Sequence, residues 1–148
     1  MVLKQTIDTE IKTAMLARDK DRLRALRSIK SLILLAESEN RDVELDEARG
    51  VDILTKAAKQ RRDSIEIYEQ QNRQDLLETE LAELKVIEEF LPKQLTEEEV
   101  KVELEKIIAK IGATSAADLG KVMGASMGVL KGKADGKVIS AVAKALLS

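Results

Sequence analysis

Apolar residues in positions 1–92 recur at spacings of three and four, which is the period of one face of an α-helix. Four such stripes follow one another, separated by polar segments. Asp19 or Asp21 can cap the second of the predicted helices, and Asp46 can cap the third. The stripes are Leu3, Ile7, Ile11 and Met15; Leu23, Leu26, Ile29, Ile33 and Ala36; Leu54, Ala58, Ile65 and Tyr68; and Leu77, Leu81, Leu84, Ile87 and Leu91.

The fourth stripe stops at Pro92, the only proline of the chain. A proline ring disfavours helix in the residue before it, so residues 92–95 are predicted to be a linker. Six of the seven glycines come after this point, which marks a change of composition. We therefore predict an N-terminal helical domain at 1–92 and a second domain at 93–148.

Three shorter helices are predicted in the second domain. Thr96 and Glu99 have the spacing of a capping box, and Gly112 suits the end of the helix that they begin. Thr114 or Ser115 can cap the next helix, and Asp135 can cap the last. Their apolar positions are Val100, Leu104, Ile107 and Ile111; Leu119, Val122, Met123 and Met127; and Val138, Ile139, Val142 and Leu146. The predicted fold class is all-α, with a four-helix N-terminal part of long amphipathic helices and a compact three-helix tail.

Composition supports this fold class and narrows the chemistry. The chain is 44% hydrophobic, yet Tyr68 and Phe90 are its only aromatic residues, so the core must be aliphatic. It has no cysteine and no histidine, which excludes disulfides, thiolate nucleophiles and the usual zinc ligands. Acid–base catalysis would need a carboxylate, lysine or tyrosine, and no such constellation stands out. We predict no catalytic residue, no metal site and no cofactor.

The longest apolar run, Leu32 to Ala36, is far shorter than the roughly 20 residues of a membrane span. The N-terminus turns acidic at once and lacks the apolar core of a signal peptide. The sequence therefore predicts a cytoplasmic protein without membrane contact.

Charge is unevenly distributed. Residues 112–148 carry five lysines and two aspartates, a net charge of +3, whereas residues 1–111 have a net charge of −5. The basic excess at one end indicates a local anionic partner. The mixed run with Lys59, Arg61 and Arg62 is mostly the solvated face of a helix, although these three basic residues could do more.

Glycines at 120, 124 and 128 recur every four residues, on one face of the predicted sixth helix. Each costs about 1 kcal/mol relative to alanine within a helix, so close contact with another backbone is expected in return. Contact with a neighbouring helix is the favoured interpretation, ahead of contact with an external partner.

The segment from Lys131 to Lys137 admits two interpretations. In the first, Gly132 allows a turn, Asp135 caps the last helix and the lysines are ordinary surface charges, with Gly136 as another site of close approach. In the second, lysines and a helix N-terminus converge on a phosphate backbone. The nucleotide-binding GxxxxGK[ST] spacing is absent. Because aromatic stacking platforms are also missing, RNA binding would depend on charge and shape.

Several segments together resemble the GatB/YqeY family, over essentially the whole chain. They are Leu91-Pro-Lys-Gln-Leu95, Gly120-Lys-Val-Met-Gly124, Met127, Lys131-Gly-Lys-Ala-Asp-Gly136, Lys59-Gln-Arg-Arg-Asp-Ser64 and Arg24 to Lys30. The second domain is similar to the helical tail of the B subunit of aspartyl/glutamyl-tRNA amidotransferase, which contacts tRNA. The resemblance implies tRNA contacts at Lys121, Lys131 and Lys133. Lys137 is added from the charge argument alone.

The resemblance also implies a family-level label of carbon–nitrogen ligase with glutamine as amido-nitrogen donor. The catalytic domain of that enzyme has no counterpart in residues 1–92, so no intrinsic amidotransferase activity is expected. Three hypotheses follow, in order of preference. The chain is a tRNA-binding accessory module, a protein–protein adaptor that docks on a tRNA amidotransferase, a synthetase or itself, or an enzyme component. No DNA partner is expected.

Overall fold

The computed structural model describes residues 2–42 and 45–148. These residues form α-helices and one short 3₁₀ helix, with no strand among them, which confirms the predicted all-α fold class. The helices are α1 (Val2–Ala17), α2 (Lys20–Glu39), α3 (Glu47–Gln70), α4 (Gln74–Phe90), α5 (Glu97–Ile111), η1 (Ala116–Asp118), α6 (Leu119–Leu130) and α7 (Gly136–Leu147).

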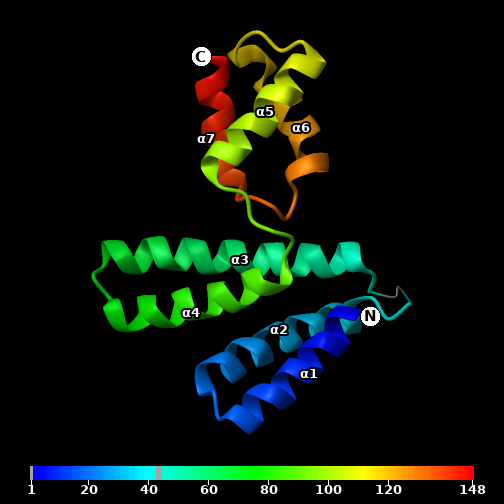
Figure 1. Cartoon of the computed structure of the whole chain (residues 1–148), viewed down its shortest axis with the longest axis vertical. Helices are drawn as coiled ribbons and strands as arrows, with labels where there is room; N and C mark the ends of the chain where they lie inside the picture. The colour runs from blue at the N-terminus through cyan, green and yellow to red at the C-terminus, as the bar shows by residue number, and fades with distance from the viewer. Residues whose placement is uncertain (1, 43–44) are drawn as a thin grey trace. The chain divides into compact units, whose positions relative to one another are not determined.

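The chain divides into two compact units, Met1–Pro92 and Lys93–Ser148. In the first unit α1 packs against α2, α3 packs against α4, and α2 also contacts α4. Figure 1 shows α1 and α2 as one hairpin, in blue, and α3 and α4 as a second hairpin, in cyan to green. Each hairpin buries its aliphatic stripes against the other, as the helical periodicity requires.

Aspartates begin two of these helices. The Asp19 carboxylate accepts a hydrogen bond of 3.1 Å from the Arg22 amide, and Asp46 accepts one of 2.9 Å from the Arg49 amide. Asp19, rather than Asp21, is therefore the cap of α2, and the predicted cap of α3 is confirmed.

In the first unit, the buried faces differ from the predicted stripes at two positions. Met15 is 53% exposed and Ala14 is buried in its place, and Leu81 is 45% exposed. A step of four residues advances about 40° beyond a full helical turn, so a stripe that repeats every four residues rotates away from the core. Ile7 and Ala14, seven residues apart, stay on the same side of α1.

Two of the three basic residues that the sequence singled out on α3 form ion pairs within the first unit. Arg61 pairs with Glu80 at 3.3 Å and with Glu83 at 3.1 Å, and Arg62 pairs with Glu88 at 3.3 Å. All three carboxylates belong to α4. Arg61 and Arg62 therefore tie α3 to α4, while Lys59 is exposed.

The second unit packs α5, α6 and α7 around an aliphatic core. The predicted capping box is confirmed: the Glu99 amide donates to the Thr96 hydroxyl at 3.2 Å, and the Thr96 amide donates to the Glu99 carboxylate at 3.1 Å. Gly112 ends α5 in the left-handed conformation, with φ of 73°, as predicted. The buried residues are Val100, Leu104, Ile107, Val122, Leu130, Ile139, Val142, Ala143 and Leu147.

Candidate nucleic-acid interface

Helix α6 turns one side inward, and that side is not the glycine stripe. Val122, Ser126 and Leu130 are fully buried there, at spacings of four residues. The Ser126 hydroxyl donates a hydrogen bond of 2.8 Å to the carbonyl of Met123, so its burial leaves no unpaired donor. Met127, predicted as an apolar position of this helix, is 47% exposed.

Gly120, Gly124 and Gly128 lie on the side of α6 opposite to this buried face, and all three are exposed. A Cβ atom built on any of them would meet no heavy atom within 4 Å. The favoured interpretation, close packing of these glycines against a neighbouring helix, is therefore wrong within this unit. Val122, Ser126 and Leu130 occupy the inward side of α6. The three glycines therefore form a strip of exposed helix surface that carries no side chains.

The two glycines of the following turn play different parts. Gly132 is buried and has φ of 76°, a conformation that glycine adopts without strain. Gly136 is the exposed first residue of α7, and a Cβ there would also meet open space. Gly132 thus serves the turn itself, whereas Gly136 leaves the start of α7 uncovered.

The predicted caps of α6 are wrong. Ser115 precedes η1 without a side-chain cap hydrogen bond, and Asp118 occupies the N-cap of α6. The Asp118 carboxylate instead accepts a hydrogen bond of 2.9 Å from the Thr114 amide. This bond, with a smaller contribution from Lys121, lowers the pKa of Asp118. The predicted cap of α7 is confirmed, since Asp135 accepts from the Lys137 amide at 3.2 Å.

The four candidate lysines are all exposed. Lys131 and Lys133 lie in the turn after α6, and Lys137 lies in the first turn of α7. These three are brought together by the short connection between the two helices. Lys121 lies in the first turn of α6, ten residues before Lys131, which is about 15 Å along a helix axis. The exposed face formed by Gly120, Gly124 and Gly128, which we call the glycine strip, runs along α6 from the level of Lys121 toward the other three lysines.

The lysine-bearing turn is held by the segment before α5. The Leu95 amide donates a hydrogen bond of 2.8 Å to the carbonyl of Lys133, and the Gln94 side chain donates one of 2.7 Å to the carbonyl of Gly132. Gln94 and Leu95 therefore belong to the second unit, and the predicted linker 92–95 is too long at its C-terminal end. Sequence reasoning missed Gln94, because its partner is 38 residues away.

The site combines exposed lysines with a face of α6 that lacks side chains at three positions. Positive charges of this kind can bind an anion. None of the helices in the described residues is long and apolar enough to cross a membrane.

Comparison with known proteins assigns the family. A family model described as Yqey-like protein matches residues 4–147. The chain belongs to the YqeY-like family. This confirms the resemblance inferred from the lysine and glycine motifs.

Curated YqeY-domain relatives come from yeasts. The chain is 37% identical over 81 residues to "Altered inheritance of mitochondria protein 41, mitochondrial" of Kluyveromyces lactis, covering 55% of this chain and 44% of that protein. The protein of the same name from Vanderwaltozyma polyspora is 38% identical over 82 residues, with the same coverage. The matched region thus spans less than half the length of these relatives. Their names place them in mitochondria, so a cytoplasmic location for this chain stays a prediction.

Proposed function

We propose that this YqeY-like chain is a tRNA-binding accessory module, related to the tail of the tRNA-dependent amidotransferase B subunit and without that enzyme's catalytic core. The observation that carries the proposal is the exposed glycine strip of α6, which ends among lysines. Three helical glycines cost about 1 kcal/mol each, and no contact inside the second unit requires them. A partner outside the chain supplies the reason for a bare helix.

A sugar-phosphate backbone fits this surface. Where the glycines leave α6 without side chains, the helix can approach an RNA helix more closely and face its sugar 2′-hydroxyl groups. The lysines at the two ends of the strip then neutralise phosphates. Residues 93–148 contain no aromatic side chain, so the binding energy would come from charge and shape rather than base stacking.

The first test is the binding of labelled bulk tRNA to the full-length protein at several salt concentrations. We expect log K to fall with log salt with a slope of about −3, as expected for four lysine–phosphate contacts. Replacing Lys131, Lys133 and Lys137 with alanine should remove most of the binding and flatten the slope by about two units, which leaves the contribution of Lys121. A wild-type protein that binds no tRNA at low salt would contradict the proposal.

A matched control distinguishes the loss of this site from a general loss of positive charge. The variant with Lys101, Lys106 and Lys110 replaced by alanine loses the same three charges from exposed positions of α5. It should keep the wild-type affinity to within about threefold, because these three lysines lie outside the candidate surface. Equal losses in both triple variants would show that tRNA follows net charge alone.

A bulky side chain placed on the glycine strip tests RNA binding a second time, without a change in charge. Gly124→Leu places a large side chain on an exposed position where nothing lies within 4 Å, so the fold should be retained. RNA affinity should drop, since the strip can no longer approach a backbone. Ala109→Leu, at an exposed position of α5, is the control that should bind normally.

An adaptor function is the second candidate, and exposed apolar side chains of the first unit favour it. Leu16 is 88% exposed and Leu35 is 54% exposed. A tRNA amidotransferase or a synthetase is the partner we would test, by co-purification with and without ribonuclease. Capture that survives ribonuclease favours the adaptor. Glutamine-dependent amidation of charged tRNA by the chain alone, which we do not expect, would instead support the carbon–nitrogen ligase label.

A further inference from the structure

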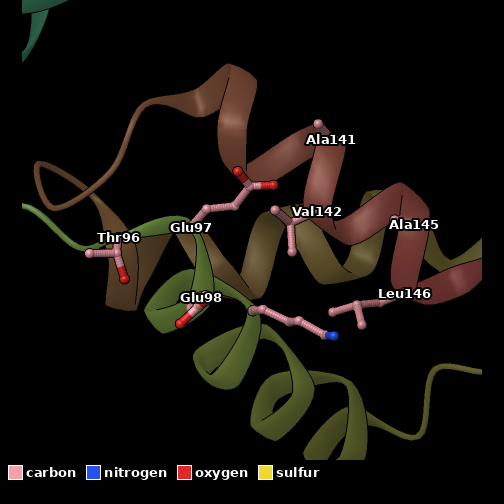
Figure 2. A pocket seen from close by; sticks show the side chains of 8 residues that line it. Thr96, Glu97, Glu98, Ala141, Val142, Ala145 and Leu146 are labelled. Atoms are coloured by element: carbon pink, nitrogen blue, oxygen red, sulfur yellow. The ribbon is translucent and has the colours of Figure 1, made fainter.

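A groove of about 810 Å³ lies between the start of α5 and α7, and none of the lysines or glycines of the candidate RNA surface lines it. Thr96, Glu97, Glu98 and Lys101 line it from α5, and Ala141, Val142, Ala145 and Leu146 line it from α7. Figure 2 shows Glu97 on the α5 side and the α7 side chains across from it.

The α7 side of the groove continues into a shallow apolar strip. Val138, Ala141 and Ala145 are exposed, and their spacings of three and four residues place them on one face of α7. Alanine side chains let a second helix approach closely, because they project little from the helix surface. A partner helix is therefore the shape that this strip accommodates.

The two flanks of the strip carry opposite charge. Val142 and Leu146 lie on its α5 side, where the exposed carboxylates of Glu97 and Glu98 follow. Lys144 is exposed and, by the helical period, lies on the other flank. Lys101 also lines the α5 side, so that flank carries two carboxylates and one ammonium group and remains acidic. Across the surface the order is thus an acidic flank, the apolar strip and a basic flank, so the surface is complementary to itself.

We propose that a second copy of this chain docks in this groove, with the two α7 helices side by side and parallel about a two-fold axis that runs along them. Such an axis exchanges the flanks, so that Lys144 of each copy meets Glu97 and Glu98 of the other. An antiparallel pair would instead place Lys144 beside its own copy. The groove and the candidate RNA surface share no residue, and they adjoin at Lys137, which lies one helical turn before Ala141 on α7.

We expect the dimer to be weak, because its interface is small. One helix face and one helix end bury less than the roughly 1,200 Å² of a stable interface. We expect a dissociation constant between about 10 μM and about 1 mM, so that dimers form only in concentrated solution.

Sedimentation velocity of the full-length protein over that concentration range is the first measurement. The wild type should shift from monomer to dimer, and Ala141→Arg should stay monomeric because it places bulk and charge in the strip. Ala109→Arg, at an exposed position of α5 outside the groove, should dimerise like the wild type. A wild type that is monomeric throughout, or a dimer that Ala141→Arg leaves intact, overturns the proposal.

Charge reversal and cross-linking test the parallel geometry. Lys144→Glu and Glu97→Lys should each weaken the dimer, and the double variant should restore it. The chain has no cysteine, so Ala141→Cys provides a single site for a short bis-maleimide. It should couple two chains with high yield, since residues near a two-fold axis meet their own copies, whereas Ala109→Cys should not. Absence of both the charge rescue and the coupling would overturn the parallel arrangement.

Discussion

The side-chain amide of Gln94 donates a hydrogen bond of 2.7 Å to the main-chain carbonyl of Gly132, a buried residue with φ of 76°. The neighbouring Leu95 amide binds the carbonyl of Lys133 in the same way. These two bonds attach the segment before α5 to the turn that carries Lys131 and Lys133. The positions of these candidate RNA-binding lysines therefore depend on a residue outside the RNA surface.

Removing this side chain should loosen the turn. Gln94→Ala leaves the Gly132 carbonyl without its side-chain partner, which should cost about 0.5–1.5 kcal/mol. Amide exchange should accelerate at Leu95 and Lys133, and tRNA affinity should fall although no lysine is lost. Gln74→Ala, which removes an exposed glutamine at the start of α4, should change neither quantity. Unchanged exchange at Leu95 in Gln94→Ala would show that the main-chain bond holds the turn alone.

Two glycines of the second unit should respond to alanine in opposite directions. Gly124→Ala fills open space on an exposed helical face and should stabilise the unit by about 0.5–1 kcal/mol. Gly132→Ala forces a side chain into the left-handed region and should destabilise it by about 1–2 kcal/mol. Urea unfolding followed by circular dichroism measures both. Destabilisation by Gly124→Ala would mean that α6 needs its glycine within the fold.

Local rules predicted several helix starts, because they act over three or four residues, although they failed at the start of α6. Asp46, Thr96 with Glu99, and Asp135 were each placed correctly as caps from the residues beside them. The direction of the glycine strip could not be predicted in this way. Periodicity groups the glycines on one face of α6, but which face turns inward depends on how α5 and α7 pack against it.

The contacts of the candidate site show the same limit. The lysines are visible in the sequence as a basic excess, whereas the bond from Gln94 joins residues far apart in the chain. The sequence singles out Arg61 and Arg62, with Lys59, as basic residues that could do more than form a solvated face, and carboxylates of α4 pair with both arginines. Only the tertiary arrangement shows which carboxylates lie close enough to pair with a given basic residue.

The capping box of α5 should make stability depend on pH. Hydrogen bonds from the Thr96 amide and hydroxyl hold the pKa of Glu99 below its ordinary value of 4.5. A carboxyl whose pKa is lower in the folded state stabilises the fold above its unfolded pKa, and this contribution is lost as the pH falls below 4.5. Glu99→Gln should therefore reduce the loss of stability on acidification.

Carbon NMR of the Glu99 carboxyl measures its pKa directly, and urea midpoints at neutral and acidic pH measure the linkage. Glu105→Gln changes an exposed glutamate in the middle of the same helix and should leave the acid-induced loss as in the wild type. A Glu99 carboxyl that titrates at or above 4.5 would contradict the expected direction.

Arg61 should be the most sensitive charged position of the first unit. Its guanidinium lies 3.1 Å from the Glu83 carboxylate and 3.3 Å from that of Glu80, and Glu83 is buried apart from 8% of its surface. Arg24 approaches Glu83 only to 3.9 Å, so Arg61→Met leaves a buried carboxylate poorly compensated. We expect a loss of about 1–3 kcal/mol, less than for a fully buried pair. Lys59→Met, at an exposed position of the same helix, should change stability by less than about 0.5 kcal/mol in the same urea titration.

Adding Glu83→Gln to Arg61→Met should recover part of the loss, because a neutral amide is less costly to bury than an unpaired charge. If the double variant is no more stable than Arg61→Met, the arginine acts through packing of its aliphatic stem rather than through its charge.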